Sequence, residues 1–176
     1  HVALRTEDIV GTVRQLRVAL KMLPFALATD RPLVERFQRE VAAVSRLSHP
    51  NIVSFLDSGE IKGRFYLSME FVAGRSLSEV VDEAGSLSEL RALEIVRDVA
   101  LALSHAHASQ IIHRDVKPEN ILLDKSGRAR LTDLGLVKNL SDDQKLTESG
   151  LAIGTPHYIS PEQARGAKVI DGRADL

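Results

Sequence analysis

The most informative part of this chain is His113-Arg114-Asp115-Val116-Lys117-Pro118-Glu119-Asn120, and Asp133-Leu134-Gly135 follows thirteen residues after its Asn. The two stretches place two acids, a Lys and an Asn in short loops, which is the equipment for moving a phosphoryl group with Mg²⁺. Such a transfer needs positioning, charge neutralisation and a base near the attacking hydroxyl. Asp115 can accept the hydroxyl proton, and Lys117 can stabilise the transferring group. Hard cations prefer oxygen ligands, which Asn120 and Asp133 supply.

These motifs resemble the catalytic loop and the metal-binding motif of protein kinases. The resemblance runs from about Arg17 to Leu176 and implies an α+β, bilobal fold with a small β-rich lobe and a helical lobe. It also implies ATP and Mg²⁺ (or Mn²⁺) as cofactors and a protein as substrate. Lys117 is typical of Ser/Thr-specific rather than Tyr-specific members. Leu134 replaces the usual Phe with another apolar side chain, so Asp133 is still expected to bind Mg²⁺.

Composition narrows the class of protein. The net charge is −1, so no global field attracts nucleic acid or an anionic membrane. Cysteine is absent, which excludes disulfides and thiolate metal sites and fits a reducing compartment. No apolar run approaches the roughly 20 residues of a membrane span. We therefore expect a cytoplasmic domain, with sensory or anchoring domains possible outside this chain.

The first part of the chain is predicted to be mostly strands. Strands are expected at 17–23, 52–58 and 64–71, with a hairpin turn at 59–63. One amphipathic helix is expected at 31–47, because apolar residues recur there at helical spacing: Val34, Phe37, Val41, Val44 and Leu47. A hinge is expected near 70–74.

The second part is predicted to be mostly helical. Helices are expected at 77–83 and 88–109, the longer one with an apolar face formed by Leu93, Val96, Ala100 and Leu103. Short strands at 121–123 and 129–132 flank a turn. The expected division is a partial ATP-binding lobe at 1–72 and a partial catalytic lobe at 73–176, whose later helices the resemblance places beyond Leu176.

The resemblance assigns an ATP site to the first lobe and the hinge. Lys21, in Val18-Ala19-Leu20-Lys21, is expected to bind the α- and β-phosphates, and Glu40 is expected to pair with it. Ala19 and Leu122 are expected to sandwich adenine. The hinge residues Glu70 and Val72 are expected to bind it through the backbone, with Met69 limiting the pocket behind.

The resemblance also assigns a substrate segment, Gly154–Glu162, in which Thr155 is expected to contact Asp115 and Lys117. Glu162 belongs to Ser-Pro-Glu, in place of the usual Ala-Pro-Glu. Runs at 47–53 and 160–166 are similar to bacterial Ser/Thr kinases in particular. Thr147 and Ser149 are the expected regulatory phosphosites, because a phosphate there can pair with Arg114.

One departure keeps other functions open. The phosphate-covering loop of the family is rich in glycine, but here only Gly11 fits, and Thr6 and Asp8 stand where glycines belong. Side chains at those positions block close backbone approach to phosphate. The alternatives are a pseudokinase scaffold or nucleotide-binding interaction module, and a small-molecule phosphotransferase. The set of acids, Lys and Asn favours the enzyme over the scaffold, and the substrate segment disfavours the small-molecule enzyme.

Overall fold

The computed structural model describes residues 2–6, 16–22, 31–134, 156–167 and 169–176. Its first sheet is antiparallel, with strand order β1-β2-β4-β3. The strands are β1 (Val2–Thr6), β2 (Leu16–Met22), β3 (Phe55–Ile61) and β4 (Arg64–Glu70). The pairing of β2 with β4 sets Ala19 opposite Met69 and Lys21 opposite Leu67. This register brings Lys21 to the inner part of the sheet.

The β3–β4 hairpin begins later than the sequence predicts. Lys62 and Gly63 form its turn, both with positive φ (51° and 73°), as a tight two-residue hairpin requires. Gly59 lies inside β3 opposite Tyr66, so the prediction of a turn at 59–63 is wrong in its first part. Ile52 does not belong to β3 because it bridges Leu131 instead.

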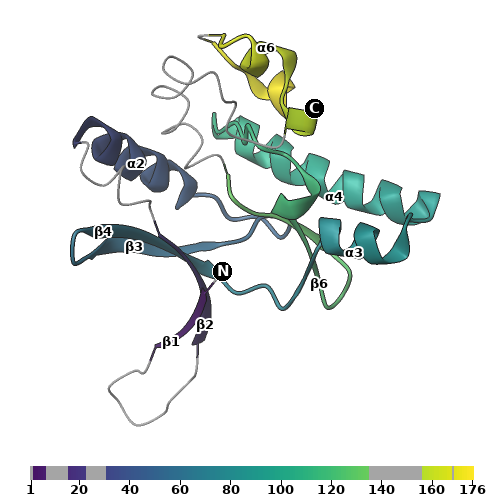
Figure 1. Ribbon diagram of the computed structural model, residues 1–176, viewed down its shortest axis with the longest axis horizontal. Helices are drawn as coiled ribbons and strands as arrows, with labels where there is room; N and C mark the ends of the chain where they lie inside the picture. The colour runs from purple at the N-terminus through teal and green to yellow at the C-terminus, as the bar shows by residue number, and fades with distance from the viewer. Residues whose placement is uncertain (1, 7–15, 23–30, 135–155, 168) are drawn as a thin grey trace.

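Helix α2 (Arg31–Val44) ends three residues before the expected boundary. Its buried residues are spaced three or four apart, which places them on one face: Leu33, Phe37, Val41 and Val44. Figure 1 shows α2 lying over one side of the sheet near β3 and β4. The rings of Phe37 and Phe65 meet there edge to face, 6.4 Å apart. The apolar stripe therefore fixes the helix on the sheet.

A second sheet of order β5-β6-β7 lies in the second part of the chain. It consists of β5 (Gly74–Ser76), β6 (Ile121–Asp124) and β7 (Ala129–Leu131). The strands β6 and β7 confirm the prediction, whereas β5 was not predicted. Helix α3 (Leu77–Ala84) follows β5 directly, and Ser76 and Glu79 close its first turn as a capping box.

Helix α4 (Glu89–Ala108) confirms the predicted long helix, with Ser88 as its N-cap. Of the predicted apolar face only Leu103 is buried, whereas Ala100 is exposed and Leu93 and Val96 are 59% and 63% exposed, so most of this face has no packing partner among the described residues. The buried side is centred on Val99 and includes Asp98, whose carboxylate accepts a hydrogen bond from the N–H of Ala129 (3.2 Å). The polar Asp98 therefore marks the side of α4 that faces β7.

The two parts of the chain are joined by the segment that follows α2. Asn51 donates from its side chain to the carbonyl of Ala129 (2.9 Å) and accepts at its own carbonyl from Leu131 (2.8 Å). Val53 donates to Leu131 (2.9 Å). Residues before the second sheet are thus hydrogen-bonded to its last strand. The chain forms a bilobal α+β fold (Figure 1).

Short elements complete the described structure. The 3₁₀ helix η1 (Pro118–Asn120) lies in the loop before β6, and η2 (Pro156–Tyr158), α6 (Pro161–Ala164) and η3 (Gly172–Asp175) lie near the end. Among the described residues, no helix has the length and apolar character needed to cross a membrane.

Candidate functional site

The loop that precedes η1 brings three predicted site residues together. Asn120 is buried and donates from its amide to both the carbonyl (2.8 Å) and the carboxylate (3.1 Å) of Asp115. Lys117 Nζ lies 3.5 Å from Asp115 Oδ2. The carboxylate therefore accepts from the amide of Asn120 and lies near the cation of Lys117.

His113, the first residue of this loop, is fully buried and holds the loop in place. Its Nε2 donates to the carbonyl of Thr132 (2.9 Å), and its Nδ1 accepts from the N–H of Asp115 (3.2 Å). A carbonyl only accepts and an N–H only donates, so these partners select the neutral Nε2–H tautomer. Burial lowers the pKa of His113, which keeps the ring neutral. His113 therefore ties Asp115 to the strand that leads to Asp133.

Asp175 is a site residue that the sequence did not reveal. Its buried carboxylate accepts from the backbone N–H groups of His113 (2.8 Å) and Arg114 (2.6 Å) and from His107 Nε2 (2.8 Å). Asp175 lies about sixty residues beyond the loop in the sequence, so no local motif connects it with His113 or Arg114. A buried carboxylate that accepts backbone N–H groups fixes the path of the loop.

The motif Asp133-Leu134-Gly135 contributes Asp133 to the same site. Asp133 takes a left-handed backbone conformation (φ 61°), and its Oδ1 lies 2.8 Å from Lys21 Nζ. Glu40 pairs with Arg36 in its own helix (3.2 Å). The predicted partner of Lys21 is therefore wrong for this structure. The sequence placed Glu40 on the inner side of the helix, but it could not tell which of two cations Glu40 meets.

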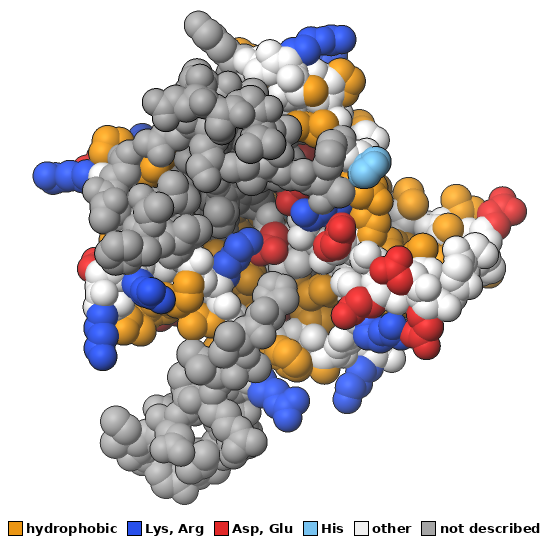
Figure 2. Space-filling model, viewed as in Figure 1, with side chains coloured by type: hydrophobic (Ala, Val, Ile, Leu, Met, Phe, Trp, Pro, Cys, Tyr) orange, Lys and Arg blue, Asp and Glu red, His pale blue; other side chains and the backbone are white. Residues whose placement is uncertain are grey.

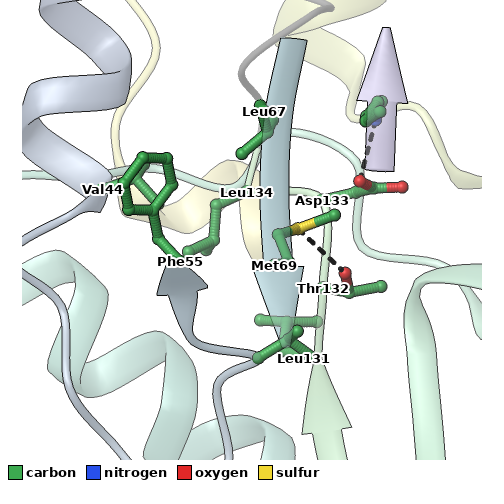
Figure 3. A pocket seen from close by; sticks show the side chains of 10 residues that line it. Val44, Phe55, Leu67, Met69, Leu131, Thr132, Asp133 and Leu134 are labelled. Carbon is green, nitrogen blue, oxygen red and sulfur yellow. Dashed lines mark hydrogen bonds and ion pairs between the residues drawn. The ribbon is translucent and has the colours of Figure 1, made fainter. Parts of the chain in front are cut away.

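Behind Lys21 lies an apolar pocket (Figure 3). Met69 and Leu134 are both buried in its wall, and Thr132 Oγ1 contacts Met69 Sδ at 3.9 Å. Its other lining residues are Lys21, Val44, Val53, Phe55, Leu67, Leu131 and Asp133. Leu134 fills an apolar position beside the metal-binding motif, as expected for a Leu in place of Phe.

The hinge residue Glu70 is fixed by its side chain. Its carboxylate accepts from the N–H of Ser54 (2.8 Å) and pairs with Arg130 of β7. The N–H of Glu70 donates to the carbonyl of Ser54 (2.9 Å). The N–H of Glu70 is therefore already engaged by Ser54. The other adenine-site candidates Ala19, Val72 and Leu122 are half-buried and pack against the core.

The donor set fits a magnesium ion bound together with a nucleotide. The amide of Asn120 uses its nitrogen toward Asp115, which leaves its oxygen as a ligand. Asp133 uses Oδ1 toward Lys21, which leaves Oδ2. The described residues contain no group of three or more His, Cys, Asp or Glu that could hold a metal alone. Mg²⁺ commonly takes one or two protein oxygens and completes its shell with water and phosphate.

The remaining predicted residues are only partly described. Glu162 is half-buried in α6, next to Gln163, whose side chain reaches the carbonyl of Arg114 (2.9 Å). Three groups of candidates lie outside the residues whose side chains the structure describes. They are the glycine-poor loop (Thr6, Asp8 and Gly11), the phosphosites (Thr147 and Ser149) and Thr155 of the substrate segment.

Comparison with known proteins agrees with this geometry. The protein kinase domain family matches residues 8–176. The serine/threonine-protein kinase PrkC of Bacillus subtilis is 44% identical over 160 residues, which cover 91% of this chain and 24% of PrkC. The serine/threonine-protein kinase PknB of Mycobacterium leprae is 39% identical over 163 residues, covering 90% of this chain and 26% of PknB. The chain thus spans about a quarter of the length of these curated relatives.

A solved structure gives the same result. The PknI kinase domain of Mycobacterium tuberculosis has a TM-score of 0.72 and 35% identity, covering 90% of this chain and 57% of that chain. The matched region includes both candidate loops and the pocket between them. The chain belongs to the protein kinase family, and its named relatives are bacterial serine/threonine kinases.

Proposed function

We propose that the protein containing this chain transfers the γ-phosphate of ATP to Ser or Thr hydroxyls of other proteins. The observation that carries the proposal is the cluster of Asp115, Lys117 and Asn120, in which one carboxylate faces a cation and an amide donor. The hydroxyl oxygen forms a bond to the γ-phosphorus as the bond to the ADP oxygen breaks. Asp115 accepts the hydroxyl proton, and Lys117 offsets the negative charge on the transferring group.

ATP and a divalent ion complete the proposed site. Lys21 would hold the α- and β-phosphates, and Asn120 and Asp133 would hold the ion, which neutralises phosphate charge. We propose Mg²⁺, with Mn²⁺ as a substitute, because oxygen ligands suit both ions. Nucleotide phosphates would then compete with Asp133 for Lys21, whose present ion pair is with that carboxylate.

The ion pairs of Lys21 and Glu40 can be compared with those of an active kinase. In active kinases the Lys on the strand pairs with the helix Glu, whereas here Lys21 pairs with Asp133 and Glu40 with Arg36. The described ion pairs therefore differ from those of an active kinase at both Lys21 and Glu40.

The alternatives predict different acceptors. A pseudokinase scaffold would retain the fold without transfer, and a small-molecule phosphotransferase would not modify protein. The presence of Lys21, Asp115, Lys117, Asn120 and Asp133 supports the kinase over the scaffold. Names of relatives such as PrkC also support it. We further propose lobes at 1–72 and 73–176, since β4 ends at Glu70 and β5 begins at Gly74, and a cytoplasmic location, where ATP is available.

The test uses the complete protein, incubated with γ-labelled ATP, Mg²⁺ and a mixture of protein acceptors. Hydrolysis of the labelled protein and separation of its amino acids should give phosphoserine or phosphothreonine. An Asp115→Asn preparation serves as the control for contaminating kinases. Label on tyrosine only, label on small molecules only, or transfer equal to the control would overturn the proposal.

A further inference from the structure

Gln163 is a buried side chain of α6 that connects this helix to the catalytic loop. Its Nε2 donates to the carbonyl of Arg114 (2.9 Å), and its Oε1 accepts from the N–H of Ser160 (3.2 Å). Only 8% of the residue is exposed. The carbonyl can only accept and the N–H can only donate, so the two partners fix which end of the amide points to the loop.

The hydrogen bond from Gln163 is made to Arg114, whose backbone is strained. Arg114 has a φ of 63°, in the left-handed region that residues other than glycine rarely adopt. Such a conformation persists only where its surroundings hold it. The N–H of Arg114 is held by Asp175 (2.6 Å), and its carbonyl is held by Gln163.

The peptide group between Arg114 and Asp115 is therefore held at both of its polar atoms. Gln163 binds its oxygen, and His113 Nδ1 accepts its N–H (3.2 Å). This peptide plane directly precedes the α-carbon of Asp115, so it sets the direction in which the carboxylate leaves the backbone. A shift of about 1 Å in a reacting group costs about 100-fold in rate.

We propose that Gln163 is a positioning residue that aligns Asp115 from α6. Because α6 begins within the segment expected to receive the substrate, the placement of that segment is transmitted to the base through Gln163. The proposal rests on the kinase function proposed above. It predicts an effect on turnover rather than on nucleotide binding, because the side-chain hydrogen bonds of Gln163 within the described part of the chain go to Ser160 and Arg114 and not to the candidate nucleotide residues.

A purely structural role for Gln163 is the competing explanation, since its Oε1 also closes the first turn of α6 in a capping box. Two variants of similar size separate the roles. Gln163→Glu keeps an oxygen for the N–H of Ser160, and Glu is equally suited to a capping box, but it presents an acceptor to the Arg114 carbonyl. Gln163→Met removes both hydrogen bonds without adding charge. Arg165→Gln, at an exposed position at the end of the same helix, is the matched control.

The experiment measures kcat and KM for ATP and for a protein acceptor in the complete kinase, together with its melting temperature and its affinity for ADP with Mg²⁺. We expect both Gln163 variants to lose about 10- to 100-fold in kcat, with KM for ATP within about twofold of wild type. Arg165→Gln should match wild type. Wild-type kcat in Gln163→Glu would show that Gln163 only caps the helix and would overturn the proposal.

Two further outcomes are decisive. Equal kcat in Gln163→Met and wild type would overturn the proposal even if Gln163→Glu failed to fold. An inactive wild type would refute the proposed function instead, so the two failures are distinguishable.

Discussion

Asp133 connects the two halves of the candidate site, since its motif follows β7 and its carboxylate pairs with Lys21 of β2. Asp133→Ala should abolish Mg²⁺-dependent binding of ATP, because of the two proposed ligands it removes the carboxylate and leaves the neutral amide oxygen of Asn120. Titration of a fluorescent ATP analogue with and without Mg²⁺ measures this.

Asp171→Ala provides the control for losing an exposed carboxylate. Mg²⁺-dependent affinity in Asp133→Ala equal to that of wild type would remove Asp133 from the metal site.

His113 makes stability depend on pH. Burial lowers its folded pKa below the ordinary value of 6.5. The unfolded chain therefore takes up a proton as the pH falls below that value while the folded chain does not, so the free energy of unfolding falls with it. His113→Gln should be less stable at every pH, but its urea midpoint should change less than that of wild type between about pH 7.5 and about pH 5.5. Equal pH slopes for the two proteins would contradict this assignment.

The residues within one loop could be predicted from the sequence, whereas their distant partners could not. Asp115, Lys117 and Asn120 are close in sequence and meet in space. Asp175 and Gln163 reach the same loop from 49 or more residues away. The Lys21–Glu40 prediction failed for the same reason, because the position of α2 and not its sequence decides the ion pair.

Elements with a clear terminal signal were predicted well. Ser88 caps α4, and the predicted and observed helices differ by one residue at each end. Both sides of α4 carry apolar residues: Val99 and Ala102 face the core, whereas Leu93 and Val96 belong to the predicted apolar face and are exposed. Hydrophobic periodicity alone cannot choose between two apolar sides.

The β5–β6 pair is the element most sensitive to a single methyl group. A Cβ on Gly74 would lie 1.9 Å from the carbonyl oxygen of Leu123. Gly74→Ala must therefore separate the strands, and we expect it to lower the free energy of unfolding by about 3 kcal/mol or more. Urea unfolding of the complete domain measures the change. Ala73→Ser, at the exposed neighbouring position, should stay within about 0.5 kcal/mol of wild type. A Gly74→Ala protein as stable as this control would disprove the close approach.

The molecule as described leaves an apolar side of α4 exposed. Leu90, Leu93, Val96 and Leu101 are between 49% and 70% exposed. Figure 2 shows apolar side chains along the end of α4 that lies on the right. Contiguous exposed apolar surface promotes association. We expect the 176-residue chain to self-associate in sedimentation velocity, and Leu93→Gln with Val96→Gln to reduce this. A chain that remains monomeric at every concentration would contradict the expectation.

The account of the whole molecule depends on Asp115 being the base of a working kinase. The most direct measurement is the single-turnover rate of phosphate transfer from ATP to a protein acceptor, in the complete wild type and in Asp115→Asn, with ATP affinity measured alongside. Asn keeps the size of the side chain but cannot accept the proton, so we predict a loss of about 1,000-fold or more in rate with ATP affinity unchanged. Equal rates in the two proteins would contradict the account.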